Sequence, residues 1–520
     1  MRTPSDETVI QSAVVGVPCA RQSRTWILVA TILGSSMAFI DSTVVNVALP
    51  SLQSSFRATV VDLQWIVESY GLLLAALILV GGSFGDRFGR RLIFLLGVSI
   101  FAVASAGCGF AENIHQLIIA RSIQGIGAAL LVPGSLAIIS TSFDEQSRGA
   151  AIGTWSGFTA ITSAVGPVLG GWLVEHASWR WVFFINFPIA AAVLAISVWR
   201  IPESRSANMR HVDWLGAILA TAALGGLIAG FVESVGLGWR NPFVIGSLIG
   251  GVGCFMAFVF VETNATEPTV PLGLFKSRSF GGANLLTLFL YSAIGIFFFL
   301  FPMNLIQVQR YSSTAAGAAV LPLILLMFVL SRWSGGLVAR YGARGPLILG
   351  PLIVGLGFVL FAVPSVGGSY WKEFFPAVVV LGLGMAVTVA PLTTVVMNSV
   401  DEDRVGTASG INNAVARVAT VLAIAVLGIV MVKAFGSRLN DSLAHSSLPP
   451  VVLQQLQANE IKLAGLQVPE SLSSATTTSI DASIREAFVF GFRIIMSICV
   501  GMSLGSSAVA WLLIRKVREP

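Results

Sequence analysis

The stretch GSFGDRFGRR, from Gly82 to Arg91, is a short polar turn between two long apolar segments, at 64–85 and 91–111. Its glycines allow a tight turn and a close approach of neighbouring helices. A looser copy, GGLVARYGAR at 335–344, again stands between two apolar segments. A polar turn that recurs in this way indicates a membrane protein built from a duplicated helical unit.

The composition of the 520-residue chain supports the same interpretation. Hydrophobic residues make up 55% of it, charged residues make up 11%, and the mean hydropathy is +0.84. Soluble domains carry about 25% charged residues and disordered chains have low hydrophobicity, so both classes are excluded. The net charge is +6, but the bases stand at the ends of apolar segments and form no stripe with aromatic residues. This pattern excludes a nucleic-acid-binding protein.

Fourteen apolar segments are long enough to cross a bilayer as helices of about 20 residues. Their predicted limits are 25–49, 64–85, 91–111, 115–139, 149–174, 180–200, 212–232, 243–261, 281–305, 314–337, 346–364, 374–397, 406–432 and 486–514. We therefore expect an all-α polytopic membrane protein. Motifs that match between the two halves predict two six-helix bundles with an inserted pair of helices. The predicted order is a tail at 1–24, the N-terminal bundle at 25–200, the inserted pair at 212–261, the C-terminal bundle at 281–514 with an outer loop at 433–485, and a tail at 515–520.

The distribution of Lys and Arg predicts the orientation in the membrane. With both termini in the cytoplasm, the short outer loops hold only Arg57, Arg180, Arg240, Arg310 and Lys372, and most other bases fall on the cytoplasmic side. The positive-inside rule favours this arrangement. The residues before Arg24 contain no short apolar region followed by a cleavage site, so we expect no cleaved signal peptide. The predicted location is the cell membrane, as a multi-pass protein.

Three further motifs lie inside predicted spans. The first span ends in DSTVVNVALP, from Asp41 to Pro50; the fourth contains RSIQGIG, from Arg121 to Gly127; and the fifth contains GPVLGG, from Gly166 to Gly171. In the last of these, Pro167 frees a backbone carbonyl and bends the helix, while the glycines give a smooth face for close packing.

These motifs resemble those of the major facilitator superfamily, and in particular its fourteen-span family of drug:proton antiporters. The resemblance implies a multidrug resistance exporter that uses the proton gradient and is not an enzyme. It also implies a role in proton coupling for Arg121; the alternative is a structural arginine that binds backbone carbonyls of neighbouring helices. It further implies conformational roles for two motifs, at Gly82, Asp86, Arg87, Gly89 and Arg90 and at Gly166, Pro167, Gly170 and Gly171. The motif from Gly82 to Arg91 would form a latch between the two halves. The alternative is a set of positive-inside anchors with no gating role.

Two acidic residues lie well inside the predicted spans, Asp41 in the first and Glu68 in the second. A carboxyl group in a medium of low dielectric can load and release a proton as a cavity changes sides, so both are candidates for proton coupling. The alternative for Asp41 is a structural role near the outer end, bonded to Thr43 or capping a helix break. We find no acid deep in the second half, and Arg332 stands in the tenth segment. This disfavours a divalent cation as substrate and leaves neutral, monocationic and anionic amphiphiles open.

The predicted substrate is an amphipathic small molecule, bound in a cavity between the two halves. Candidate polar residues lining that cavity are Asn46, Gln124, Asn304, Gln307 and Asn412, with the aromatic residues Trp65, Tyr70 and Trp155. The other expected partners are the lipid bilayer and protons. A periplasmic adaptor protein is a further candidate partner for loop 433–485, in which 451–463 predicts a short amphipathic helix. No Walker loop is present, which argues against ATP as the energy source. The alternative functions are a proton-coupled symporter for uptake of a small metabolite and a receptor that transports nothing.

Overall fold

The computed structural model describes residues 21–205, 213–265, 268, 270–400, 404–444, 448–469 and 472–514. In this part of the chain every regular element is a helix, and 14 helices or runs of helix are long and apolar enough to cross a membrane. The predicted all-helical fold class is confirmed. The predicted tails lie outside the described residues, apart from 21–24.

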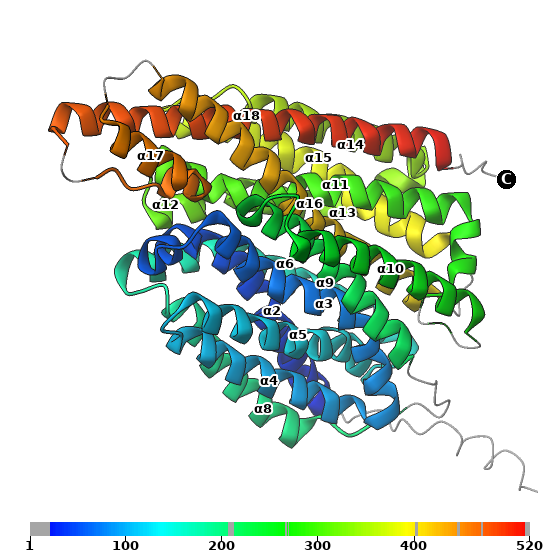
Figure 1. The fold of residues 1–520 in the computed structure, drawn as a ribbon. Coiled ribbons are helices and arrows are strands. Elements are labelled where there is room, and N and C mark those ends of the chain that lie inside the picture. The colour runs from blue at the N-terminus through cyan, green and yellow to red at the C-terminus, as the bar shows by residue number, and fades with distance from the viewer. Residues whose placement is uncertain are drawn as a thin grey trace, which may run out of the picture.

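The helices of the first half pack against one another. They are α2 (Arg21–Phe56), α3 (Val60–Phe88), α4 (Arg90–Phe110), α5 (Ile114–Ser142), α6 (Glu145–His176), the short α7 (Trp181–Phe184) and α8 (Asn186–Arg200). The most extensive contacts join α5 to α3 and α4, and α2 to α6 and α8. In Figure 1 these helices, coloured blue to cyan-green, form the lower part of the molecule.

The second half forms the upper part of Figure 1. It contains η1 (Leu272–Lys276), α11 (Arg278–Met303), η2 (Asn304–Val308), α12 (Ser313–Ala318), α13 (Leu321–Tyr341), α14 (Arg344–Phe361), η3 (Tyr370–Phe374), α15 (Phe375–Asn398), α16 (Val405–Leu443), α17 (Pro450–Ala458), η5 (Glu460–Gly465) and α18 (Ser474–Leu513). Here α11, α16 and α18 contact one another, and α14 packs between α15 and α18.

The predicted inserted pair is α9 (Trp214–Leu237) and α10 (Pro242–Asn264), which pack closely together. α9 also packs against α3 of the first half and α16 of the second, whereas α10 is largely exposed. The pair therefore lies along the junction of the two halves, where α9 touches both. The exact limits of the predicted bundles stay a prediction.

The molecule has two ends, which we name by their connections. The loop end holds residues 448–469, and the turn end holds the α3–α4 connection at Gly89. Gly89 has a φ of +121°, a conformation that residues with a Cβ rarely adopt. A Cβ there would also come within 2.7 Å of the Glu203 carboxylate, which accepts hydrogen bonds from the backbone N–H groups of Arg91 and Leu92.

The predicted outer loop at 433–485 contains helix in the structure. α16 continues to Leu443 and α18 begins at Ser474, so helix occupies both ends of the predicted loop. The predicted helix at 451–463 is confirmed as α17, followed by the 3-10 turn η5. One face of this segment is buried, since Val452, Leu456 and Leu463 lie in the main hydrophobic core, whereas Val451 on the other face is exposed.

Candidate functional site

Asp41 and Arg121 form an ion pair in the interior of the first half. Arg121 Nη1 donates to Asp41 Oδ2 at 2.5 Å, and the two side chains are 1% exposed for Arg121 and 0% for Asp41. Gln124, one turn along α5, donates from Nε2 to Asp41 Oδ1 at 2.8 Å and accepts from Arg121 Nη1 at 2.7 Å. Both oxygens of the carboxylate are therefore engaged. The cluster joins α2 to α5, and Asp41 lies near the middle of α2 because this helix extends to Phe56.

Arg121 has further partners on α3. Its Nε donates to the carbonyl of Ile66 at 3.1 Å, and its guanidinium carbon lies 4.3 Å from the centre of the Tyr70 ring. This geometry is a cation–π contact in a buried setting. Tyr70 and Arg121 also line the central cavity described below. A change in the charge of Asp41 can therefore reach the cavity wall through one arginine.

Glu68 lies on α3 and is fully buried. Neither carboxyl oxygen has a hydrogen-bond partner among the described residues. Its neighbours Val67, Tyr70 and Gly71 line the central cavity, but Glu68 itself does not. An ionised carboxylate at this position would have no donor or cation to offset its burial, whereas a protonated one has a much smaller desolvation cost.

A cavity of about 1060 Å³ lies between the two halves. Its wall comes from α2, α3, α5 and α6 of the first half and from α11, α12, α13, α15 and α16 of the second. Most of the lining is apolar, including Phe39, Val67, Phe298, Met327 and Met385. Its polar groups include Ser42, Asn46, Ser156, Asn413 and Arg417. The volume and the mixture of apolar wall and few polar groups suit a small amphipathic ligand.

Of the five polar residues predicted to line the cavity, only Asn46 does so. Gln124 is bonded to the Asp41 cluster, and Gln307 Nε2 donates to Gln53 Oε1 at 2.7 Å. Asn412 Nδ2 donates to Thr287 Oγ1 at 2.8 Å, and Asn304 is buried near Gln309. Helical periodicity explains the difference, since residue 413 faces the cavity and its neighbour Asn412 faces α11. Trp65 and Trp155 also lie outside the lining; their indole nitrogens donate to Glu233 and Ser35.

The GPVLGG motif forms a seam at the loop end. A Cβ on Gly166 or Gly170 would strike Thr43 or Val44 of α2, so these two glycines allow α6 to pack on α2 within the first half. A Cβ on Gly171 would strike the backbone of Ser313 at the start of α12. The backbone of Pro167 is similarly close to Gly317 on α12. One motif thus serves packing inside the first half and contact between the halves.

Hydrogen bonds also cross between the halves at the loop end. Gln53 accepts from Gln307 and donates from Nε2 to the carbonyl of Lys462 at 2.9 Å, so it joins α2, η2 and η5. Glu175 Oε2 accepts from the backbone N–H of Thr314 at 3.0 Å. With the glycine seam, these bonds hold the two halves together at this end.

The latch residues at the turn end have partners in their own half. Arg90 Nη2 lies 2.7 Å from Asp86 Oδ1, and Arg87 is exposed with its guanidinium 5.5 Å from the ring centre of Phe88. A Cβ on Gly82 would make only an ordinary contact with Pro133, at 3.7 Å. Among the described residues, Asp86 has no partner in the second half, so the predicted latch is not closed across the halves in this conformation.

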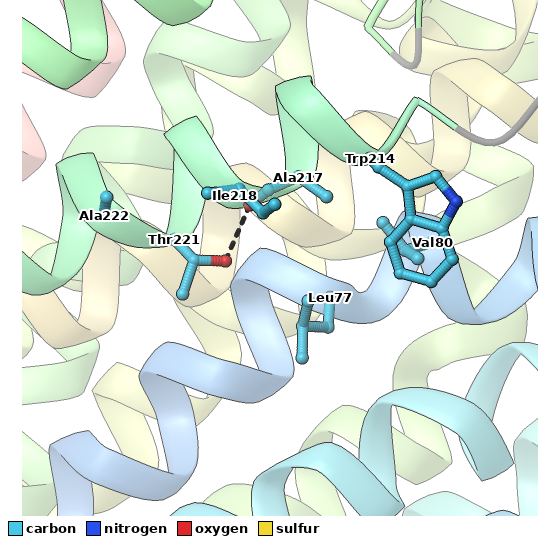
Figure 2. A pocket seen from close by; sticks show the side chains of 7 residues that line it. All are labelled: Leu77, Val80, Trp214, Ala217, Ile218, Thr221 and Ala222. Atoms are coloured by element: carbon cyan, nitrogen blue, oxygen red, sulfur yellow. Dashed lines mark hydrogen bonds between the residues drawn. The ribbon is translucent and has the colours of Figure 1, made fainter.

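A second cavity of about 350 Å³ lies between α3 and α9 near the turn end. Figure 2 shows its wall, formed by Leu77, Val80 and residues 214–222 of α9. Its one hydroxyl, on Thr221, donates back to the carbonyl of Ala217 at 2.7 Å. Apart from this hydroxyl and the indole nitrogen of Trp214, the side chains of the wall are apolar, so the central cavity, with its several polar groups, is the better candidate site.

The sequence prediction assigned no role to two charged residues. Glu233 stands just beyond the predicted end of a span at 232, but α9 continues to Leu237 and Glu233 accepts from Trp65 Nε1 at 2.8 Å. Arg417 belongs to the thirteenth apolar segment and has no role in the sequence prediction, although a lone arginine in an apolar helix is a signal in itself. The side chain of Arg332 lies outside the described residues.

Comparisons with known proteins agree with this fold. The model of the Major Facilitator Superfamily matches residues 31–215 and 212–424. The tetracenomycin C resistance and export protein of Streptomyces glaucescens is 32% identical over 499 residues, covering 94% of this chain and 91% of that protein. Multidrug resistance protein Stp of Mycobacterium tuberculosis (strain CDC 1551 / Oshkosh) is 35% identical over 431 residues, covering 82% of this chain and 79% of that protein.

Among solved structures, a bacterial homologue of the human lysosomal transporter Spinster matches with a TM-score of 0.66 and 16% sequence identity, covering 96% of this chain and 100% of that one. At this identity the match shows the fold alone. The chain belongs to the Major Facilitator Superfamily and is related to its drug and antibiotic resistance exporters. It is a multi-pass membrane transporter and not an enzyme, and the resemblance seen in its motifs is confirmed.

Proposed function

We propose that this chain is a proton-coupled antiporter that exports amphipathic small molecules across the cytoplasmic membrane. The observation that carries the proposal is the buried Asp41–Arg121 ion pair, because Arg121 also forms part of the wall of the central cavity. The relatives named for resistance and export support a small-molecule substrate. The outward direction is supported by the GPVLGG motif, which resembles that of exporting families.

The proposed orientation puts the turn end and both termini in the cytoplasm. Its support is the concentration of bases at the turn end, including Arg87, Arg90, Arg91 and Arg344, as the positive-inside rule requires. The loop end, sealed at Gly171 and Gln53, would then face outward. In this conformation the cavity would exchange its substrate with the cytoplasm.

Proton coupling is proposed to run through Asp41. While this carboxylate is ionised, it holds Arg121 Nη1 and Gln124 Nε2. A proton on Oδ2 would turn the acceptor of Arg121 into a neutral group and leave the guanidinium uncompensated beside Tyr70. The wall of the cavity would change in charge and shape. The Asp41–Arg121 interaction, which joins α2 to α5, would weaken. Glu68 is proposed as a second carrier, since its unbonded carboxyl group can exchange a proton without breaking an ion pair.

The conformational residues are proposed to act at opposite ends. Opening of the loop end would separate α6 from α12 at Gly171 and Pro167 and break the Gln53–Gln307 bond. Closure of the turn end would bring the Gly82–Arg91 loop against the second half and give Asp86 a partner there. At the loop end, α17 presents the exposed Val451, and an adaptor protein that bound the transporter would meet this helix.

The test measures the direction of proton movement in proteoliposomes with a trapped pH-sensitive dye. Ethidium, chloramphenicol and 1-anilinonaphthalene-8-sulfonate are added outside as cationic, neutral and anionic amphiphiles. Antiport predicts that a transported probe makes the lumen more alkaline as protons leave in exchange. Symport, the alternative, predicts that the lumen becomes more acidic. No proton movement with any probe, despite probe uptake, would contradict proton coupling.

A further inference from the structure

One charged residue of the central cavity has no partner among the described residues. Arg417 lies on α16, well inside the span that runs from Thr407 to Leu443, and it is half-buried in the cavity wall. It makes no hydrogen bond or ion pair with any residue that the structure describes. A charged side chain within a membrane span is costly, so such residues usually face a cavity or a partner that compensates the charge.

The rest of the lining does not compensate this charge. The cavity wall contains two cations, Arg121 and Arg417, and none of its described lining residues is Asp or Glu. Arg121 is neutralised by Asp41 behind the wall. Glu68 is buried outside the lining. The cavity therefore presents one uncompensated positive charge in an otherwise apolar and weakly polar space.

The surroundings of Arg417 indicate what would compensate it. The same cavity is lined by the apolar side chains of Met327, Phe328 and Met385, and near Arg417 on α16 lie Asn413 and Thr420. A guanidinium group presents a planar fork of donors that matches a carboxylate, sulfonate or phenolate. A molecule with one such group on an apolar body would satisfy both parts of the wall.

We propose that Arg417 is the specificity-determining residue of the cavity and that it binds the anionic group of an amphipathic anion. The proposal rests on the proposed function, since it assumes that the central cavity holds the substrate. It narrows the substrate class that the sequence left open among neutral, monocationic and anionic amphiphiles. Outward movement of an anion and inward movement of a proton both carry positive charge inward, so a membrane potential negative inside drives both steps.

The experiment compares two fluorescent probes that share an N-phenyl-naphthylamine body. 1-Anilinonaphthalene-8-sulfonate carries one sulfonate, and N-phenyl-1-naphthylamine carries no charge. Binding of each is titrated to the purified full-length protein in lipid nanodiscs, as wild type, Arg417→Gln and Arg417→Lys. The control is Lys372→Gln, which removes one exposed positive charge far from the cavity, in the η3 turn at the loop end.

The expected result is selective. Arg417→Gln should weaken binding of the sulfonate by about 10- to 100-fold, the loss expected for a charge-assisted hydrogen bond. It should leave binding of the neutral probe unchanged, which also shows that the variant is folded. Arg417→Lys should recover part of the sulfonate affinity, and Lys372→Gln should behave as wild type.

Other outcomes overturn the inference. Equal losses for the two probes would mean that Arg417 supports the structure and not the anion. Unchanged sulfonate binding in Arg417→Gln, or wild-type binding of the neutral probe alone, would show that the site does not select anions. In these cases the proton-movement assay still decides whether the chain is an antiporter. If wild type binds neither probe, the cavity is not an amphiphile site, and the inference fails together with its premise.

Discussion

Arg121 Nη1 and Asp41 Oδ2 lie 2.5 Å apart in the buried interior of the first half, and they tie the fourth span to the first. The pair is not isolated, since Gln124 binds both partners and Tyr70 covers the guanidinium. Arg121 therefore connects a titratable group with the wall of the central cavity. This connection is what the proposed exchange of protons for substrate requires.

The two buried acids should differ in their contributions to stability. Asp41→Asn breaks a buried ion pair and leaves Arg121 uncompensated, which costs about 3–5 kcal/mol in comparable cases. Glu68→Gln replaces a carboxyl group that has no hydrogen bond with any described residue by a neutral group of the same shape, so the free energy of unfolding should stay the same or rise. Thermal unfolding of the two purified variants compares them directly. A loss for Glu68→Gln as large as that for Asp41→Asn would show that Glu68 has a partner in the folded protein.

Gly171→Ala should force the loop end apart. The new Cβ would meet the backbone of Ser313, which cannot move as a flexible side chain can, and overpacking of this kind costs about 1–3 kcal/mol. Spin labels at the exposed positions Ser55 and Lys372 would report the separation by pulsed electron resonance, with a longer distance expected in the variant. The control is Gly246→Ala on α10, where a Cβ meets nothing within 4 Å. An unchanged distance distribution in Gly171→Ala would contradict the close packing of α6 against α12 at Gly171.

Gln53→Ala should favour opening at the same end by a different route. It removes the bonds to Gln307 and to the carbonyl of Lys462, each worth about 1 kcal/mol. A cysteine placed at Leu463, which is fully buried, should react faster with a membrane-impermeant maleimide in this background. Ser54→Ala on the exposed side of α2 is the matched control, because the one bond of its hydroxyl to a described residue is to the carbonyl of Ser51 within the same helix. Equal labelling rates in the two backgrounds would count against a role for Gln53 in closure.

The stability of the packing of η5 against α16 should depend on pH through the carboxyl group of Glu460. Burial raises the pKa of the Glu460 carboxyl above its usual value, against a smaller opposing effect of its hydrogen bond with Asn440 on α16. The docked segment therefore binds protons more strongly than the undocked one, and docking should weaken as the pH rises through the ordinary range for glutamate up to the raised pKa. The protection of residues 450–466 against hydrogen exchange, measured relative to the intrinsic exchange rate at each pH, should be greater at acidic pH than at neutral pH. Glu460→Gln should remove this difference, and a difference that persists in the variant would assign it to another group.

The sequence was a good guide to the elements of this molecule. Apolar segment length predicted fourteen spans, and the glycines of GPVLGG predicted close helix packing, because both features follow from composition along the chain. The ends of the elements were harder to predict. The last span was predicted to begin at 486, whereas α18 begins at Ser474, and an ion pair between Asp481 and Arg485 supports the helix ahead of the predicted limit.

The contents of the site could be predicted only in part. Asp41, Glu68 and Arg121 stood out as charges in apolar segments, but the pairing of Asp41 with Arg121 depends on the packing of α2 against α5. Which polar residues line the cavity depends on helix rotation to within one residue, as Asn412 and Asn413 show. Sequence periodicity does not fix rotation when a helix is apolar on all sides.

The most direct test of the central claim is substrate-driven proton movement by Asp41→Asn in proteoliposomes. The probe is whichever of the three amphiphiles gives the largest pH change with wild type. The variant should still bind that probe and exchange it across the membrane, but proton movement per molecule of probe should fall, since an asparagine side chain does not titrate as a carboxyl group does. The loss should reach at least about 10-fold when Glu68→Gln removes the second proposed carrier as well. Proton movement equal to that of wild type would contradict the assignment of Asp41 as the coupling residue.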